Sequence, residues 1–220
     1  MYEDKGLQYY THVRREIAPL IPANCERILE IGCGQGDTLL WLKNTQQHCQ
    51  WVGGVEFFPD SARIAQERLD WFCSGNIETL DLSIEKGTLD LILCLDVLEH
   101  LVDPWAVVAK LHPLLKPNGA IVASIPNIRF FKASLGLVLL GNWQYVQEGI
   151  LDRTHLRFFT KKTAIELMQS SGLHCDQIIG KGLERGRKAR WFNFLTCGIL
   201  RPFFEFQYLI RVTQKISQSS

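Results

Sequence analysis

The segment ILEIGCGQGD, residues 28–37, restricts the fold more than any other part of the sequence. An apolar, strand-like run enters Gly32, Gly34 and Gly36, and a helix-type pattern begins directly afterwards. Glycines at these positions let the backbone turn sharply and approach a ligand closely, because no Cβ stands in the way. The N–H groups at the start of the following helix can bind that ligand. The segment therefore predicts an α/β sheet with a nucleotide-like ligand at its topological switch point.

The rest of the chain alternates between strand-length apolar runs and helix-period segments, which is typical of a parallel sheet with crossover helices. Predicted strands span Arg27–Ile31, Trp51–Val55, Trp71–Ser74, Leu89–Leu95, Ala120–Ser124, Leu173–Gly180 and Phe206–Val212. Predicted helices span Gly36–Asn44, Pro59–Leu69, a segment from Pro104 to about Lys116–Gly119, and Thr160–Ser171. Two segments depart from this alternation of strands and helices. They are a long connection over residues 126–159, with an apolar patch at 133–140, and a basic, aromatic-rich insert over 181–204. No repeat or linker divides the chain, so we expect a single domain over residues 1–220.

Composition limits the compartment and the partners. A net charge of +1 gives no general attraction to nucleic acid, so no nucleic-acid partner is expected. The charge is uneven, because residues 181–220 contain eight basic and two acidic residues. The seven cysteines are scattered without zinc-type spacing, which predicts no metal site and favours a reducing compartment. Signal-peptide and membrane-spanning patterns are absent from the sequence, so a cytoplasmic location is expected.

The spacing of the glycines argues against a dinucleotide. A G-x-G-x-x-G fingerprint would place its third glycine at position 37, which is Asp37 in this chain. Glu30 and Asp37 suit a ligand with a positive amino-acid end and no phosphate, which describes S-adenosylmethionine. Glu56 follows Gly36 by twenty residues, at the end of the second predicted strand, where a carboxylate can accept both ribose hydroxyls. Because NAD also has this ribose, an NAD-dependent oxidoreductase remains a disfavoured alternative.

Five segments, in order, resemble successive motifs of class I S-adenosylmethionine-dependent methyltransferases. They read ILEIGCGQGDTLLWL, VGGVEFFPDSARIAQERL, GNIETLDL, LDLILCLDVLEHLVDPWAVVAKLHPLLKPNGAIVASIPN and DRTHLRFFTKKTAIELMQSSGL. The chain is most similar to the branch that includes ubiquinone-biosynthesis O-methyltransferases and many small-molecule methyltransferases, over about residues 25–180. The resemblance implies a Rossmann-like three-layer α/β sandwich with a mostly parallel seven-stranded sheet. The implied strand order is 3-2-1-4-5-7-6, with the last strand antiparallel and a lid after strand five.

The resemblance also implies a set of cofactor-binding residues. The methionine part of the cofactor would lie against Glu30, Gly32, Cys33, Gly34 and Gly36, with the backbone of Leu95 and with His100 nearby. Glu56 would hold the ribose, Phe57 and Phe58 would lie next to the adenosine, and Asn76 and Ile77 would flank the adenine.

A hydroxyl acceptor must be positioned and must lose its proton, usually to a side chain within hydrogen-bond reach. His155 is the predicted base, because it lies in the connection that covers the cofactor in this family, and Asp152 could orient it. A structural role for His155 remains equally open. The predicted acceptor-binding residues are Asn127, Arg129, Trp143 and Arg157, although the arginines fit ordinary salt bridges as well.

The function expected from these features is methylation of a small-molecule acceptor, most often at a hydroxyl and possibly on a hydrophobic molecule. The motif LCLDVLEH replaces the Asn/Asp-Pro-Pro-aromatic motif of many methyltransferases that act on amino groups of nucleic acids and proteins. A non-catalytic S-adenosylmethionine-binding subunit and an N- or C-methyltransferase remain alternatives. Apolar residues in 128–140 and aromatic residues in 191–208, flanked by basic residues, could touch a membrane surface; a packed cap or a dimer interface is the other interpretation. A monomer and a homodimer both fit the sequence.

Overall fold

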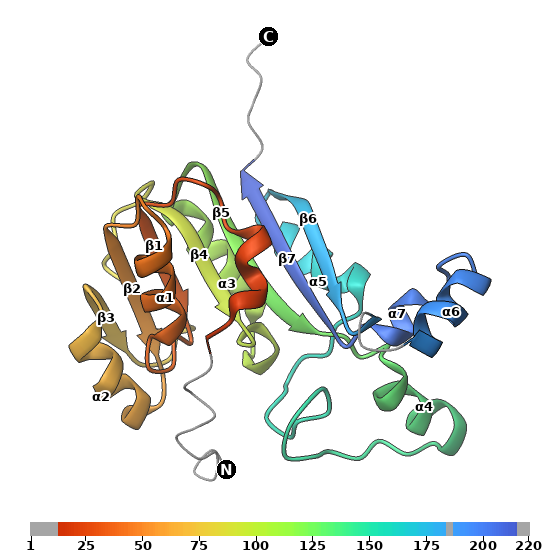
Figure 1. Ribbon diagram of the computed structural model, residues 1–220. Coiled ribbons are helices and arrows are strands. Elements are labelled where there is room, and N and C mark those ends of the chain that lie inside the picture. The colour runs from red at the N-terminus through yellow and green to blue at the C-terminus, as the bar shows by residue number, and fades with distance from the viewer. Residues whose placement is uncertain (1–12, 184–186, 215–220) are drawn as a thin grey trace.

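The computed structural model describes residues 13–183 and 187–214, and one seven-stranded sheet runs through it (Figure 1). Its strands are β1 (Arg27–Ile31), β2 (Trp51–Glu56), β3 (Trp71–Ser74), β4 (Leu89–Leu95), β5 (Leu115–Pro126), β6 (Leu173–Lys181) and β7 (Gln207–Gln214). Their order is β3-β2-β1-β4-β5-β7-β6. Strands β1 to β5 pair in parallel, and β7 is antiparallel to both of its neighbours. The implied strand order and the antiparallel last strand are therefore confirmed.

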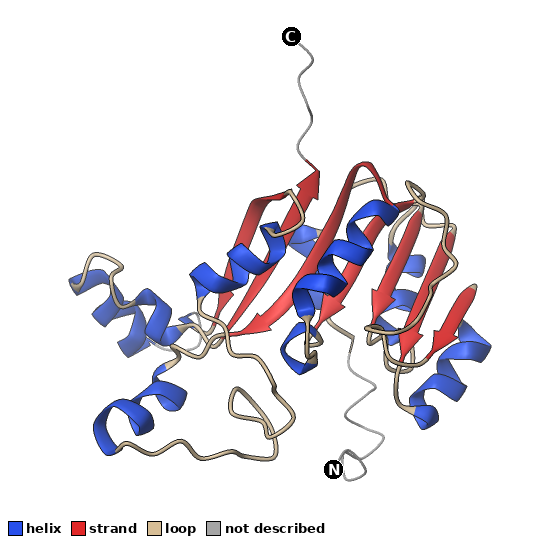
Figure 2. Cartoon of the chain, turned by 180° about the vertical axis from the view of Figure 1, so that it is seen from behind, coloured by secondary structure: helices blue, strands red, loops and turns tan. Residues whose placement is uncertain are grey.

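Helices cover both faces of the sheet and complete three layers (Figure 2). One face packs against α1 (Asp37–Thr45), α2 (Pro59–Arg68) and the 3-10 helix η2 (Arg15–Leu20), and the other against α3 (Pro104–Leu111) and α5 (Lys161–Gln169). Successive residues of β1 alternate between the two cores, with Leu29 and Ile31 on the α3 side and Ile28 on the α1 side. Glu30 follows the alternation of Ile28, so its carboxylate is buried on the α1 side.

The start of β5 differs from the prediction. The helix predicted to end near Lys116–Gly119 ends at Leu111, and a 3-10 turn, η4 (His112–Leu114), follows it. Pro113 accounts for the early end, because proline has no N–H to continue the helical hydrogen bonds. The strand then begins at Leu115 instead of Ala120, and its register with β4 shifts between Leu89 and Leu91. The residues that the sequence assigned to a helix end form a bulged strand start.

The long connection after β5 and the insert after β6 both contain helices. The apolar patch of the connection is helix α4 (Phe131–Leu140), which ends at Gly141 with a φ of 61°. The insert contains α6 (Arg187–Leu195) and α7 (Arg201–Phe204). Figures 1 and 2 show these three helices beside the sheet, beyond the ends of β6 and β7. In the two described ranges, no helix combines the length and the apolar character that crossing a bilayer requires.

Candidate functional site

A cavity of about 820 Å³ opens at the carboxyl ends of β1, β2 and β4. The chain connections from β1 and β4 diverge to opposite faces of the sheet at this edge, which makes it the topological switch point. Eleven of the twelve residues that the resemblance assigned to the cofactor line this cavity. They are Glu30, Gly32, Cys33, Gly34, Glu56, Phe57, Phe58, Asn76, Ile77, Leu95 and His100. Gly36 does not line it; this glycine precedes α1 with a φ of 84° and packs against Leu69.

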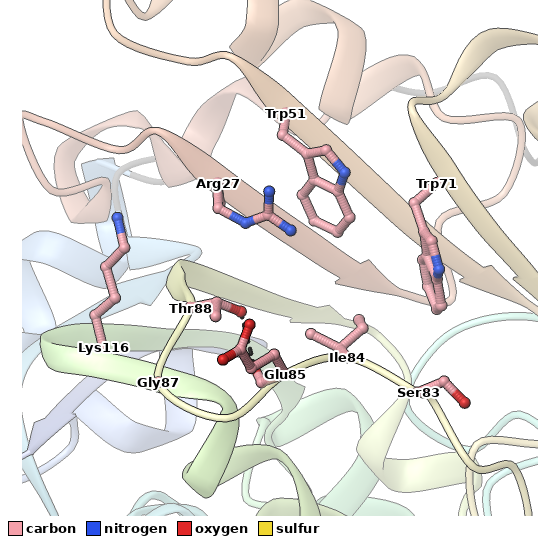
Figure 3. Close-up of a pocket in the computed structure, with 9 residues that line it drawn as sticks. All are labelled: Arg27, Trp51, Trp71, Ser83, Ile84, Glu85, Gly87, Thr88 and Lys116. Carbon is pink, nitrogen blue, oxygen red and sulfur yellow. Dashed lines mark hydrogen bonds between the residues drawn. The ribbon is translucent and has the colours of Figure 1, made fainter.

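Another cavity, of about 440 Å³, lies at the opposite edge of the sheet, where the strands begin (Figure 3). Figure 3 shows the guanidinium of Arg27 over the indole of Trp51, with Trp71 beyond it. The Arg27 Cζ is 4.2 Å from the centroid of the Trp51 ring, and Gly53 leaves room for this indole on the sheet. None of the predicted site residues lines this second cavity. We therefore take the first cavity as the candidate site.

The glycine loop adopts a backbone that requires glycine. Gly32 and Gly34 have φ angles of 69° and 54°, in the left-handed region. The N–H of Gly32 donates to the Val55 carbonyl at 2.8 Å, which ties the loop to the end of β2. A Cβ on Gly32 would lie 2.5 Å from a methyl group of Val97, so a larger residue would force the loop or Val97 to shift.

Glu56 fixes the loop and faces the same cavity. Its Oε2 accepts a hydrogen bond from the Gly34 N–H, and its Oε1 accepts one from the Phe58 N–H, each at 2.8 Å. Burial raises the pKa of this carboxyl, and the two backbone donors oppose that rise. Each carboxylate oxygen can accept more than one hydrogen bond, so Glu56 can also accept the hydroxyls of a ribose.

Glu30 is a buried carboxyl group in the wall of the cavity. Burial raises its pKa to about 8, although the nearby Arg14 guanidinium lowers it. Its Oε2 has no hydrogen-bond partner among the residues that the structure describes. A buried carboxylate oxygen left unpaired is costly, and an ammonium group would satisfy it. The cavity thus fits a ligand that combines an adenosine with a cationic amino-acid end.

A polar network that the sequence analysis missed closes one side of this cavity. Asp96, at a φ of 56°, accepts hydrogen bonds from Arg14 and Ser124, and from the Gln207 Nε2 at 2.6 Å. Arg14 and Gln207 both line the cavity. They are 82 and 111 residues from Asp96 in the chain, and neither belongs to a local motif, so sequence spacing carried no signal for them.

The two candidate histidines lie together, with ring centroids 4.7 Å apart. His100 lines the cavity, whereas His155 is not among the residues that line it. The His100 Nδ1 lies 3.2 Å from the Thr154 carbonyl oxygen, and the Thr154 hydroxyl donates to Asp152 at 2.8 Å. The His155 Nδ1 lies 2.9 Å from the Ile150 carbonyl oxygen. Asp152 therefore acts through Thr154 on the orientation of His100.

Glu99 lies beside these histidines and is almost completely buried. Burial, and then the charge of Asp96, raise the pKa of its carboxyl well above the usual range. Both oxygens have no hydrogen-bond partner within the described part of the chain. Glu99, His100 and His155 each offer one ligand atom, and these atoms lie within 4.8 Å of one another. In residues 13–183 and 187–214, this group is the one that could hold a metal ion.

None of the four predicted acceptor-binding residues lines the cavity. Asn127 is fully buried, and its Nδ2 donates to the carbonyls of Pro202 and Glu205 at 2.7 and 2.6 Å. The Arg129 guanidinium stacks over Phe203 at 4.9 Å, and the Trp143 ring contacts Phe158 with centroids 5.0 Å apart. The guanidinium of Arg157 donates to the Val102 carbonyl. Asn127, Arg129 and Arg157 thus join the connection after β5 to the body of the protein or to the segment before β7, whereas Trp143 packs within the connection.

Comparison with known proteins agrees with this geometry. A family profile described as "Methyltransferase domain" matches residues 6–178. The ubiquinone biosynthesis O-methyltransferase of Xylella fastidiosa (strain 9a5c) is 28% identical over 198 residues, covering 83% of this chain and 77% of that protein. A SAM-dependent methyltransferase structure from Archaeoglobus fulgidus matches with a TM-score of 0.68 at 17% identity, covering 95% of both chains. A Haloferax volcanii methyltransferase, solved in complex with the Trm112 methyltransferase activator, matches with a TM-score of 0.63 at 13% identity, covering 96% of this chain and 91% of that one.

Proposed function

Since the chain belongs to the class I S-adenosylmethionine-dependent methyltransferases, we propose that it methylates a hydroxyl oxygen of a small-molecule acceptor. Bound S-adenosylmethionine supplies the activated methyl group, and the protein supplies position, orientation and a path for the acceptor's proton. The observation that carries the proposal is His100, an imidazole in the cavity wall whose Nδ1 is oriented by Thr154. The O-methyltransferase relative at 28% identity supports the choice of oxygen.

In this proposal, different residues of the cavity bind different parts of the cofactor. Glu56 accepts the ribose hydroxyls, and Phe57, Phe58, Asn76 and Ile77 surround the adenosine. Glu30 accepts the ammonium of the methionine part, because its Oε2 is buried and has no partner in the described chain. Arg14 lines the same cavity and is already paired with Glu16 and Asp96; its remaining N–H groups can donate to the carboxylate of that part.

Two histidines are candidates for the base that removes the acceptor's proton. His155 is the residue that the sequence favours, but His100 is the one of the pair that lines the cavity. We propose that His100 accepts the proton and that His155, Thr154 and Asp152 hold its ring. The Asp152–Thr154–His100 contacts support this division of roles.

Replacing His100 with glutamine is expected to lower turnover by about 100-fold or more, because general-base catalysis typically contributes that much. Cofactor affinity is expected to fall far less than turnover, because His100 lines the cofactor cavity but in this proposal acts on the acceptor. The measurement is S-adenosylhomocysteine release with phenols and alcohols, beside calorimetry with S-adenosylmethionine. His174→Gln, an exposed histidine on β6, is the control. If His155→Gln abolishes turnover while His100→Gln does not, His155 is the base and our assignment is wrong.

Titration of the protein with S-adenosylmethionine, S-adenosylhomocysteine and NAD, followed by the acceptor panel, tests the proposed function itself. We expect binding of the first two ligands, no binding of NAD, and a product with the new methyl group on oxygen by NMR. A product methylated on nitrogen or carbon would replace the O-methylation proposal. Cofactor binding without turnover on any acceptor would point to a subunit that needs a partner protein, as the activator complex of the Haloferax neighbour illustrates.

A further inference from the structure

The last turn of α4 is apolar and exposed in every direction. Val138, Leu139 and Leu140 are 74%, 70% and 79% exposed, and Leu135 and Leu137 are each 44% exposed. Successive residues of an α-helix point about 100° apart, so three consecutive exposed residues point to all sides of the helix axis. A helix that is apolar all round normally lies inside a protein core or a membrane.

Helix α6 and the turn after it add a second apolar surface. Trp191, Phe194, Leu195 and Ile199 are each more than half exposed. The first three are spaced i, i+3 and i+4, so they lie on one face of the helix. Basic residues precede them, because α6 begins with Arg187 and Lys188 and continues with the exposed Arg190.

The two surfaces belong to one part of the molecule, which we name the docking face. It comprises Leu135 and Leu137–Leu140 of α4, together with Trp191, Phe194, Leu195 and Ile199. The ring centroids of Phe131, at the start of α4, and Phe204 of α7 are 6.3 Å apart, and α4, α6 and α7 stand together in Figures 1 and 2. Residues 126–147 and 187–204 contain six basic residues and no acidic one, in a chain whose net charge is +1.

We propose that the docking face binds the surface of an anionic lipid bilayer. The end of α4 enters the apolar region, and α6 lies at the level of the headgroups, with the exposed Arg190 near the lipid phosphates. A protein partner covers one side of a helix, whereas a bilayer surrounds it, and the end of α4 is apolar on all sides. Arg201 forms an ion pair with Glu205, and the other basic residues of the two segments select an anionic surface.

The docking face is attached to the edge of the sheet that holds the cavity. Helix α4 follows β5, and α7 leads into β7, where Pro126 of β5 pairs with Gln207. Gln207 lines the cavity, and the buried Asn127 joins the connection to α7 by its hydrogen bonds to Pro202 and Glu205. A docked protein therefore holds this edge of the sheet near the membrane. Docking itself requires neither the cofactor nor the proposed base.

Sedimentation with vesicles tests this proposal. We expect the protein to bind vesicles that contain phosphatidylglycerol at least about tenfold more tightly than vesicles of phosphatidylcholine alone, and to be released by salt. The triple variant V138S/L139S/L140S is expected to lose at least about tenfold in binding, because the inserted apolar area disappears. Phe194→Ser tests α6 separately. Trp105→Ser, which changes an exposed tryptophan on α3 outside the docking face, is the control.

Several results would overturn the proposal. They are failure of the unchanged protein to bind either vesicle, equal binding by the triple variant, or loss of binding in the Trp105 control. A dimer that the triple variant converts to a monomer, without vesicle binding, would identify the face as an interface between two copies. Unchanged S-adenosylmethionine affinity in the triple variant shows that it is folded, because none of the three residues contacts the cavity.

Discussion

Replacing Glu56 with alanine is expected to weaken S-adenosylmethionine binding by about 100-fold or more. The substitution removes the acceptor for the ribose hydroxyls, and hydrogen bonds to a charged group contribute about 1.5–3 kcal/mol each. It also leaves the N–H groups of Gly34 and Phe58 without the carboxylate that they bind at 2.8 Å. The glycine loop then loses one of its attachments at the edge of the cavity. Calorimetric titration with S-adenosylmethionine and S-adenosylhomocysteine measures the effect.

A matched control separates the local role of Glu56 from a general loss of negative charge. Glu67→Ala removes a carboxylate from the exposed side of α2. This variant is expected to bind S-adenosylmethionine with the affinity of the unchanged protein. Glu56→Gln keeps the shape of the side chain and is expected to bind with intermediate affinity, because one amide oxygen still accepts hydrogen bonds. Equal affinity in Glu56→Ala and Glu67→Ala would show that Glu56 does not hold the ribose.

Replacing Glu30 with glutamine is expected to stabilise the protein at pH 8 and to weaken cofactor binding at the same pH. Burial raises the pKa of Glu30 to about 8, far above that of an exposed glutamate. Below the pKa that Glu30 has in the unfolded chain, both the folded and the unfolded chain hold the proton. The raised pKa then does not change the free energy of unfolding. Between the pKa in the unfolded chain and pH 8, the unfolded chain releases the proton and the folded chain keeps it. The free energy of unfolding therefore falls by about 1.4 kcal/mol per pH unit as the pH rises.

Glutamine cannot ionise, so the variant avoids this loss. The buried amide of the glutamine lacks full hydrogen bonding, and this lowers the free energy of unfolding by about 1–3 kcal/mol, which offsets part of the gain. We expect a net stabilisation on the order of 2 kcal/mol at pH 8 and none, or a slight destabilisation, near pH 4. Denaturant unfolding at the two pH values measures this difference. A variant less stable than the unchanged protein at pH 8 would contradict the buried, costly state of Glu30.

The affinity for the cofactor is expected to rise with pH because of Glu30, whereas the free energy of unfolding falls. An ammonium group beside the carboxylate favours its ionised form, so binding releases a proton and becomes tighter as the pH rises toward 8. We expect affinity to rise by up to about tenfold per pH unit over the range below 8, and we expect Glu30→Gln to remove this dependence. Calorimetry in buffers of different ionisation enthalpy counts the released proton. Any pH dependence of cofactor affinity that persists in Glu30→Gln arises from other ionisable groups of the cavity.

Local sequence patterns were sufficient for the parts of the site that lie within one strand-loop-helix unit. Glu30 and Glu56 lie among the last two residues of β1 and β2, the glycine loop follows β1 directly, and the alternation of a β-strand fixes which side each carboxylate faces. Arg14 and Gln207 escaped prediction because they reach Asp96 from opposite ends of the chain. Only the packing of η2 and the antiparallel course of β7 bring them there, and no spacing rule encodes either.

The histidine cluster shows the same limit at short range. Asp152 and His155 are three residues apart, which suggested a direct interaction between their side chains. The carboxylate of Asp152 also accepts hydrogen bonds from the N–H and the hydroxyl of Thr154, each at 2.8 Å, a contact that this spacing did not reveal. Outside a helix, a spacing of three residues does not fix which side chains meet. The apolar patch at 133–140 posed a similar problem, because its periodicity could not show that the helix would remain uncovered.

The position of Gln207 has a consequence for how this protein is made. Domains generally form from the N-terminus as the ribosome releases the chain, at about 5–20 residues per second. The glycine loop and Glu56 emerge early, but Asp96 gains its Gln207 contact only when β7 enters the sheet between β5 and β6. Ribosome-bound chains that stop before residue 207 would therefore carry every recognisable motif and still lack Gln207, which lines the cavity and binds Asp96. Tight cofactor binding is then expected only of chains that extend through β7, because those chains alone can place Gln207 against Asp96.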